Sequence, residues 1–89
     1  MKNVNGKEIE VYSVTRKPAG YGHWQITVDL RYNEEYRKFT ATTNNMPAFD
    51  EANDLEDYNE RAEVYYEIIS GQIKEEIIEW MEEVDESND

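Results

Sequence analysis

The chain has 89 residues, no cysteine and a formal net charge of −12 at pH 7. A chain of this length folds as one domain around a modest core, and without cysteine it forms neither a disulfide framework nor a thiolate zinc site. No stretch approaches the roughly 20 apolar residues of a membrane span, and residues 1–7 lack the apolar run of a signal peptide, so we expect a cytoplasmic protein.

Three strands are predicted in the first half of the chain. Residues 7–15 alternate between apolar and polar side chains and form the first strand, and residues 23–32 give the clearest alternation. A third strand follows at about 36–43. The Pro- and Gly-containing segment 16–22 is predicted to be a loop, and Asn44-Asn45-Met46-Pro47 ends the sheet because proline cannot donate to a ladder.

The alternation also predicts which side chains face the core. In the second strand the apolar side consists of Trp24, Ile26, Val28, Leu30 and Tyr32. In the first strand Ile9 and Val11 are predicted inside, because Glu8 and Glu10 share the face of Tyr12. The opposite face of the sheet is predicted to be mixed and solvated, with Tyr12, Val14, Gln25, Thr27, Thr40 and Thr42.

The connection between the second and third strands sets their register. A four-residue loop over 33–36 places Leu30 opposite Phe39 and Val28 opposite Ala41. Both pairs are then apolar and lie on one face, whereas a slip of one residue would move every side chain to the other face. We therefore predict this register.

A long helix is predicted at about 54–85, capped by Asn53 or Asp54. Its apolar stripe holds phase across Ser70-Gly71, which favours one continuous or kinked helix, although a break at the glycine stays open. Residues 86–89 are expected to fray. The predicted core stripe consists of Leu55, Tyr58, Ala62, Tyr65, Ile69, Ile73, Ile77, Trp80, Met81 and Val84.

The predicted fold is therefore α+β. A three-stranded antiparallel β-meander carries one long, kinked or continuous C-terminal α-helix across one face, in the order βββα. Residues 47–53 are allowed one short helical turn before that helix. Residues 1–89 form a single domain, with no internal repeat.

Catalytic and metal-binding motifs do not emerge from the sequence. The single histidine, His23, opens the second strand, and none of the three serines has a catalytic motif around it. The acid-rich segment 50–57 is not an EF-hand loop, because Leu55 and Arg61 occupy the positions that require Gly and Glu. We therefore expect a protein that is not an enzyme, with no cofactor and no metal.

The charge is distributed unevenly. Residues 1–49 carry five acids and seven bases, a net charge of +2, whereas residues 50–89 carry sixteen acids and two bases, a net charge of −14. A surface of this charge repels nucleic acid and anionic membranes and attracts basic protein surfaces. We expect a basic protein partner, and no direct binding of nucleic acid or membrane.

Within the predicted helix the glutamates recur at steps of four and three residues, which aligns them on one face. This acidic stripe consists of Glu56, Glu60, Glu63 and Glu67, followed after Ser70-Gly71 by Glu75, Glu79, Glu82 and Glu86. Like charges at this spacing repel one another by about 0.2–0.5 kcal/mol per pair. One interpretation is a solvating face. The other is a mimic of the phosphate backbone, which occupies a basic groove on a nucleic-acid-binding protein.

Size, acidity, absence of cysteine and the βββα order over about residues 7–85 resemble small phage-encoded inhibitors of bacterial defence, especially anti-CRISPR proteins. One anti-CRISPR family that inhibits a CRISPR nuclease combines an acidic three-stranded sheet with flanking helices at about this length. The resemblance implies an inhibitor in the cytoplasm of a bacterial host, acting where the nuclease reads the PAM duplex. This chain shares no motif with that family and lacks its N-terminal helix, so no functional residue is carried over.

The order of elements is also similar to that of double-stranded RNA-binding domains. Those domains need a basic final helix, and Glu60, Glu63 and Glu67 exclude that function here.

Three hypotheses follow for the function. We predict a non-enzymatic inhibitor that occupies a basic nucleic-acid groove. Two alternatives stay open: a regulatory module that forms a homodimer through the open sheet face, using Tyr12, Val14 and Thr27, and an antitoxin-like neutraliser of a basic protein. The predicted partner-binding residues are Glu56, Glu60, Glu63, Glu67, Glu75, Glu79 and Glu82.

Overall fold

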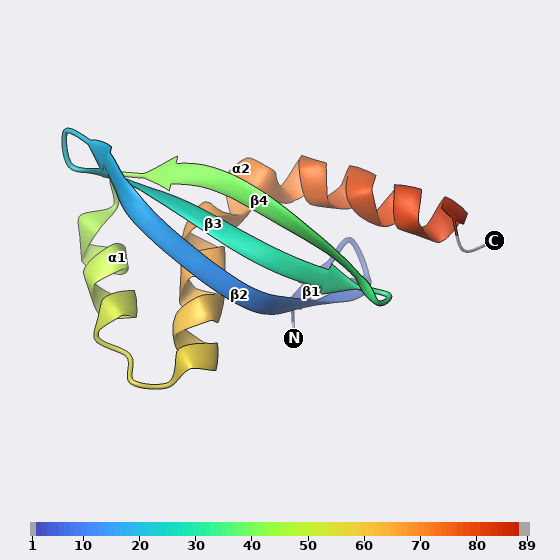
Figure 1. Ribbon diagram of the computed structural model, residues 1–89, viewed down its shortest axis with the longest axis horizontal. Helices are drawn as coiled ribbons and strands as arrows, with labels where there is room; N and C mark the ends of the chain where they lie inside the picture. Colours follow the sequence, from blue (N-terminus) through green and yellow to red (C-terminus); the bar gives the residue numbers. More distant parts are fainter. Residues whose placement is uncertain (1, 88–89) are drawn as a thin grey trace.

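A computed structural model describes residues 2–87 as a four-stranded antiparallel sheet with two helices on one face (Figure 1). The elements are β1 Lys2–Val4, β2 Lys7–Gly20, β3 His23–Tyr32, β4 Glu35–Thr43, α1 Met46–Asn53 and α2 Tyr58–Ser87. The predicted α+β class, the antiparallel meander and the long C-terminal helix are confirmed. The predicted count of three strands is wrong, because the sheet has the order β1-β2-β3-β4.

The additional strand, β1, is short and precedes the predicted sheet. It pairs with the start of β2 through a turn at Asn5-Gly6, with backbone φ angles of 52° and 81°. Asn-Gly is the dipeptide that two-residue hairpin turns favour, because both positions need positive φ. Val4 is buried by this pairing, so the hairpin adds to the core.

The loop predicted at 16–22 is much shorter than expected, because β2 continues through Gly20. Tyr21 and Gly22 alone make the turn to β3, with φ angles of 49° and 77°. Pro18 lies within β2, paired with Trp24. Val14, four residues earlier, donates its N–H outward to Tyr58 on α2. The alternation of the ladder places the nitrogen of Pro18 on the same outer side, where a proline costs no ladder hydrogen bond.

A bulge in β2 settles which of its residues face the core. Val11 lies opposite Leu30 and Ser13 opposite Asp29, so Tyr12 is an extra residue without a partner. Ile9 is buried and Val11 packs against the core, as predicted. Val14 was predicted on the open face, but the bulge reverses the alternation and turns Val14 to the core side.

The hairpin between β3 and β4 differs from the predicted register by two residues. Its turn is Asn33-Glu34, both with positive φ, and Val28 lies opposite Phe39 rather than Ala41. Asparagine tolerates the left-handed conformation that such a tight turn needs. Because the shift is an even number of residues, the predicted faces of both strands are unchanged.

The helical part consists of two helices rather than one helix from 54. Asn45 caps α1 by accepting the N–H of Ala48 at 3.4 Å, and Asn53, predicted as a cap, is its last residue. The cap of α2 is Asp57, whose Oδ1 accepts the N–H groups of Asn59 at 2.8 Å and Glu60 at 3.1 Å. The separate α1 lets Phe49 stack on Trp24, with ring centroids 4.6 Å apart.

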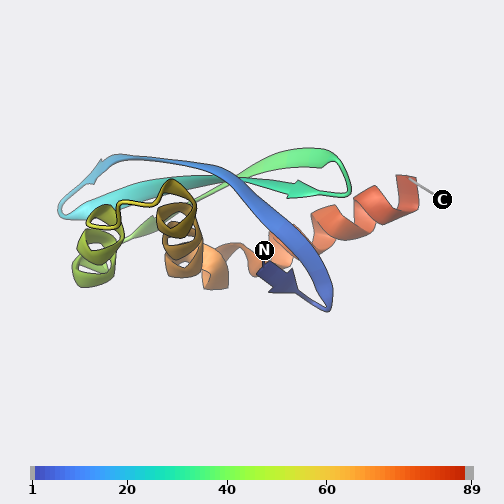
Figure 2. The same cartoon turned by 90° about the horizontal axis from the view of Figure 1, so that it is seen from below.

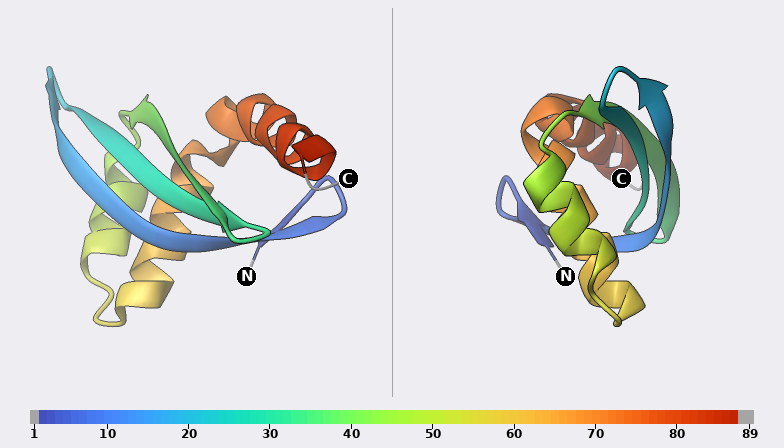
Figure 3. Two further views of the ribbon diagram at one scale, coloured as in Figure 1. Left: turned by 45° about the vertical axis from the view of Figure 1, so that its right-hand side comes forward. Right: turned by 90° about the vertical axis from the view of Figure 1, so that its left-hand side faces the viewer.

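α2 crosses the face of the sheet from one edge to the other (Figures 1 and 2). Near its start, Tyr58 Oη accepts the outward N–H of Val14 on β2 at 3.3 Å. Farther along, Gln72 Nε2 donates to the carbonyl of Thr42 on β4 at 2.8 Å. Its ribbon changes direction midway, as Figure 3 shows, near the predicted kink at Ser70-Gly71. There Ser70 Oγ donates to the carbonyl of Glu67 at 3.1 Å, a side-chain bond that bends helices.

The core lies between α2 and the sheet. From Ala62 to Val84 every residue of the predicted core stripe is buried, and Tyr66 is buried in addition. Leu55 falls in the turn before α2, and Tyr58 is 50% exposed at the edge of β2. The helix continues through Ser87, so residues 86–87 do not form the predicted tail, and 88–89 lie outside the described residues. Neither described helix is long and apolar enough to cross a membrane.

Candidate functional site

The kink divides the predicted acidic stripe into two parts with different surroundings. Glu56 lies in the turn before α2 and is not on the helix. Over residues 61–70 Glu67 is the one exposed residue, because the sheet, α1 and β1 enclose this segment. The structure therefore does not bring the predicted residues together into a single continuous face.

In the enclosed segment, carboxylates have contacts within the chain. Lys2 Nζ on β1 lies 2.6 Å from Glu67 Oε1. The hydrogen bond to Glu67 raises the pKa of Lys2 above its ordinary value, and the charge of Glu63 adds to the shift. Glu63 is half-buried. These two glutamates therefore hold the β1 hairpin against α2.

The second segment of α2 presents its acids to solvent. Glu75, Glu79, Glu82 and Glu86 are all exposed, at steps of four, three and four residues. Within residues 2–87, none of the four forms an ion pair with a basic side chain. We call these four residues the outer acidic row. They lie on the side of the helix opposite to Ile77 and Val84, which face the core.

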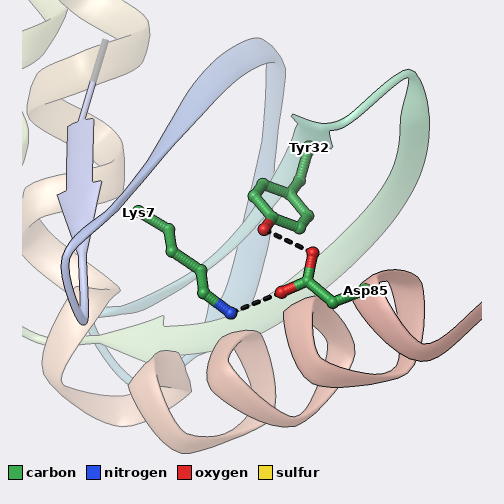
Figure 4. A network of polar contacts seen from close by, with 3 residues as sticks. All are labelled: Lys7, Tyr32 and Asp85. Atoms are coloured by element: carbon green, nitrogen blue, oxygen red, sulfur yellow. Dashed lines mark hydrogen bonds and ion pairs between the residues drawn. The ribbon is translucent and has the colours of Figure 1, made fainter. Parts of the chain in front are cut away.

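The acids on the flanks of the second segment contact the sheet instead. Figure 4 shows Asp85 between Lys7, at the start of β2, and Tyr32, at the end of β3. Lys7 donates to one carboxylate oxygen of Asp85, and Tyr32 Oη donates to the other at 2.7 Å. The hydrogen bond from Lys7, followed by that from Tyr32, lowers the pKa of Asp85. Asp85 in turn raises the pKa values of Lys7 and Tyr32 through the same hydrogen bonds.

On the other flank, a groove of about 450 Å³ separates α2 from β4. Its aromatic part is formed by Phe39 and Trp80, whose ring centroids are 5.7 Å apart. Arg37 Nη1 reaches across to Glu83 Oε2 at 3.5 Å. The residues that line the groove are Arg37, Lys38, Phe39, Thr40, Glu76, Glu79, Trp80 and Glu83.

Sequence reasoning missed this groove. Glu76 and Glu83 lie outside the predicted acidic stripe, and Arg37 and Lys38 were assigned to a strand without a further role. The spacing of Glu76, Glu79 and Glu83, at steps of three and four, is the signal that places them on one flank of the helix. That this flank meets β4 depends on the tertiary structure.

The open face of the sheet differs from the predicted one along β2, because of the bulge at Tyr12. Val14 is turned to the core side, so the proposed dimer surface loses it. Tyr12 and Tyr36 are 55% and 52% exposed and form an edge-to-face pair at 5.1 Å. Thr27 and Thr40 are joined by a 2.9 Å hydrogen bond between their hydroxyl oxygens, so these polar groups already pair with each other.

Among the described residues, no group of three or more His, Asp or Glu side chains is arranged to hold a metal ion. His23 opens β3 and is exposed, in the position that the sequence predicts. The outer acidic row and the groove beside it remain as the candidate binding sites on the described surface.

Comparison with known proteins adds no relative. The sequence matches no known protein family, and no curated protein or solved structure is significantly similar to it.

Proposed function

We propose that the protein is a non-enzymatic inhibitor that binds a basic, nucleic-acid-binding surface of another protein through the outer acidic row. The observation that carries this proposal is the exposure of four carboxylates in one line, none of which forms an ion pair within residues 2–87. The four ion pairs of the described chain are formed with other acids, which are Glu67, Asp85, Glu10 and Glu83. No ion pair within residues 2–87 therefore involves the row.

The charge density of the row supports mimicry of a nucleic-acid strand. At a rise of about 1.5 Å per residue, Glu75 and Glu86 are about 16 Å apart along the helix axis. One strand of duplex DNA carries about five phosphates over that axial length, and the row carries four carboxylates. A groove that binds a phosphate backbone would thus meet a similar density of charge on a rigid element.

Repulsion within the row favours a partner over a purely solvating role. Like charges three and four residues apart cost about 0.2–0.5 kcal/mol per pair, and alternating signs would keep the helix soluble without that cost. Lysine or arginine side chains of a partner would remove the repulsion and gain charge-assisted hydrogen bonds. A CRISPR effector in a bacterial host is the target class that the resemblance to anti-CRISPR proteins suggests.

The test compares two variants with the same change in net charge. Glu75→Lys with Glu82→Lys reverses the row, and Asp50→Lys with Glu51→Lys reverses two exposed acids of α1. Each variant serves as bait in a nuclease-treated lysate, and bound proteins are then challenged with duplex DNA.

The proposal expects a nucleic-acid-binding protein that wild type and the α1 variant capture, that DNA releases, and that the row variant loses. Rim charges alter the association rate, whereas desolvated pairs cost about 2–5 kcal/mol when broken, so we expect binding at least about a hundredfold weaker. Equal capture by all three baits, or a complex that duplex DNA joins without displacing it, contradicts mimicry.

A further inference from the structure

The outer edge of β4 is a second surface with binding capacity. β4 is the last strand in the order β1-β2-β3-β4, so one side of its backbone has no neighbouring strand. Because a two-residue turn joins β3 to β4, Tyr32 and Glu35 form the first hydrogen-bonded pair. Hydrogen-bonded pairs then alternate along the ladder. The N–H and C=O groups of Tyr36, Lys38, Thr40 and Thr42 therefore point away from the sheet.

One of these outward groups is already satisfied, and this confirms the direction. The carbonyl of Thr42 accepts a 2.8 Å hydrogen bond from Gln72 on α2. In the described chain, no hydrogen bond reaches the outward backbone groups of Tyr36, Lys38 or Thr40. All three residues are exposed. An edge of this kind is a template for an additional strand.

The groove between β4 and α2 lies along this edge, so an added strand would have one face over it. Figure 1 shows the second segment of α2 beside β4. Trp80, which is 5% exposed, and Phe39 form the apolar part of the groove. Glu76 and Glu79 line it without an ion pair within residues 2–87.

The spacing of the acids suits an extended segment. Side chains on one face of a strand are about 6.8 Å apart. Glu79 and Glu83 are about 6 Å apart along the helix axis. Glu83 has its one ion pair with Arg37, a 3.5 Å contact between two exposed side chains, which a partner side chain would readily replace.

We propose that β4 binds an extended basic segment of a partner protein as an additional strand, whose alternate Arg or Lys side chains enter the groove toward Glu76, Glu79 and Glu83. Main-chain hydrogen bonds would supply affinity, and the groove would select the side chains, as in other cases of strand addition. Glu79 belongs to both surfaces, whereas Glu75 and Glu82 of the outer acidic row do not line the groove. A variant with Glu75 and Glu82 reversed therefore separates this contact from the proposed function.

A second copy of the chain is a poorer occupant of this edge. Antiparallel pairing of two β4 strands about a two-fold axis at Lys38 would place two lysines opposite each other. It would also bring together two chains that each carry a net charge of −12. The groove has three acids, Glu76, Glu79 and Glu83, against Arg37 and Lys38 on β4. A basic segment whose side chains reach the acids of α2 is therefore favoured over a second copy, which adds a net charge of −12.

The test uses a synthetic peptide of nine residues, the length of β4, with alternating arginine and valine and blocked ends. Its matched control carries the same side chains but is N-methylated at alternate residues, so that the edge facing β4 cannot donate hydrogen bonds. Binding is measured by titration calorimetry, and the contact is located by amide chemical shifts of Tyr36, Lys38 and Thr40. We expect the methylated peptide to bind at least about tenfold more weakly than the unmethylated one, because several main-chain hydrogen bonds are lost.

Two protein variants locate the contact from the other side. Lys38→Pro removes an outward donor without breaking the ladder to β3, and Lys38→Thr is its control for the lost charge. Glu76→Lys reverses a groove acid, with Glu51→Lys as its control. The proposal expects loss of binding in the proline and Glu76→Lys variants, while both controls and Glu75→Lys with Glu82→Lys bind like wild type.

Equal binding of the methylated and unmethylated peptides to the wild-type protein overturns the proposal, because charge alone would then explain it. Absence of binding overturns it as well. The comparison of the two peptides needs no mutant, so a proline variant that fails to fold leaves the test intact. Loss of binding in the variant with Glu75 and Glu82 reversed, with Glu76→Lys unaffected, would assign the peptide to the outer acidic row instead and also contradict the proposal.

Discussion

The two segments of α2 have similar sequences and different surroundings. Residues 61–70 are enclosed by the sheet, by α1 through Phe49 and Tyr65, and by β1 through Lys2 and Glu67. Residues 71–87 rest on the sheet with one face and present the others to solvent. Glu67 of the first segment therefore forms an ion pair within the fold, whereas the four acids of the outer acidic row form none within residues 2–87. Whether an acid of α2 forms an ion pair therefore depends on whether the element packed beside it carries a basic side chain within reach.

The largest expected effect is a loss of stability when the buried contact between the second segment of α2 and the sheet is removed. Trp80 packs edge-to-face against Phe39 and Tyr32, at 5.7 and 6.1 Å. Trp80→Ala leaves a cavity under this segment and should lower the free energy of unfolding by about 3–5 kcal/mol. Thermal and urea unfolding measure this loss. A melting temperature within about two degrees of wild type would show that the second segment is not held by this contact.

A smaller effect on stability is expected when one glutamate is neutralised in each segment of α2, and the two changes should have opposite signs. Glu67→Gln removes the ion pair with Lys2, and exposed pairs of this kind contribute about 0.2–1 kcal/mol. Glu82→Gln removes repulsion from Glu79 and Glu86, a gain of about 0.2–0.5 kcal/mol per pair. The first change should lower the melting temperature and the second should raise it, and both shifts should shrink at high salt. Shifts of the same sign would mean that the two segments do not differ electrostatically.

The smallest effect depends on pH and concerns the contact of Asp85 with Lys7 and Tyr32. Because the folded state lowers the pKa of Asp85 below its ordinary value of 3.8, its contribution is present above that value and is lost as pH falls through the folded pKa. The raised pKa values of Lys7 and Tyr32 give contributions that are lost as pH rises through their folded values. The stabilisation is therefore complete at neutral pH.

Asp85→Asn should lower the melting temperature at pH 7, and the difference from wild type should disappear in acid below the folded pKa of Asp85. Glu86→Gln is the matched control, since Glu86 is exposed and unpaired within the described chain. Melting curves of the three proteins between neutral and acid pH measure the effect. A difference between wild type and Asp85→Asn that persists unchanged in acid would assign the loss to packing rather than to charge.

Local patterns in the sequence were enough for the main elements and for the helix face. Alternation located β3 and the core side of Ile26, Val28 and Leu30, and the spacing of apolar residues located the buried stripe from Ala62 to Val84. These predictions succeeded because a period of two or of nearly four residues directly reflects burial on one face. The Asn5-Gly6 turn carried a usable signal that was overlooked.

Tertiary structure decided what the acids of α2 do. The acidic stripe is regular in sequence, yet the fold binds Glu67 to Lys2 of the β1 hairpin and leaves the outer acidic row without an ion pair within residues 2–87. Lys2 and Glu67 are 65 positions apart and meet only on folding. The bulge at Tyr12 and the two-residue turn at Asn33-Glu34 likewise depend on how whole strands pair. Periodicity records which side of an element is buried, whereas the neighbour that buries it is determined by contacts distant in the chain.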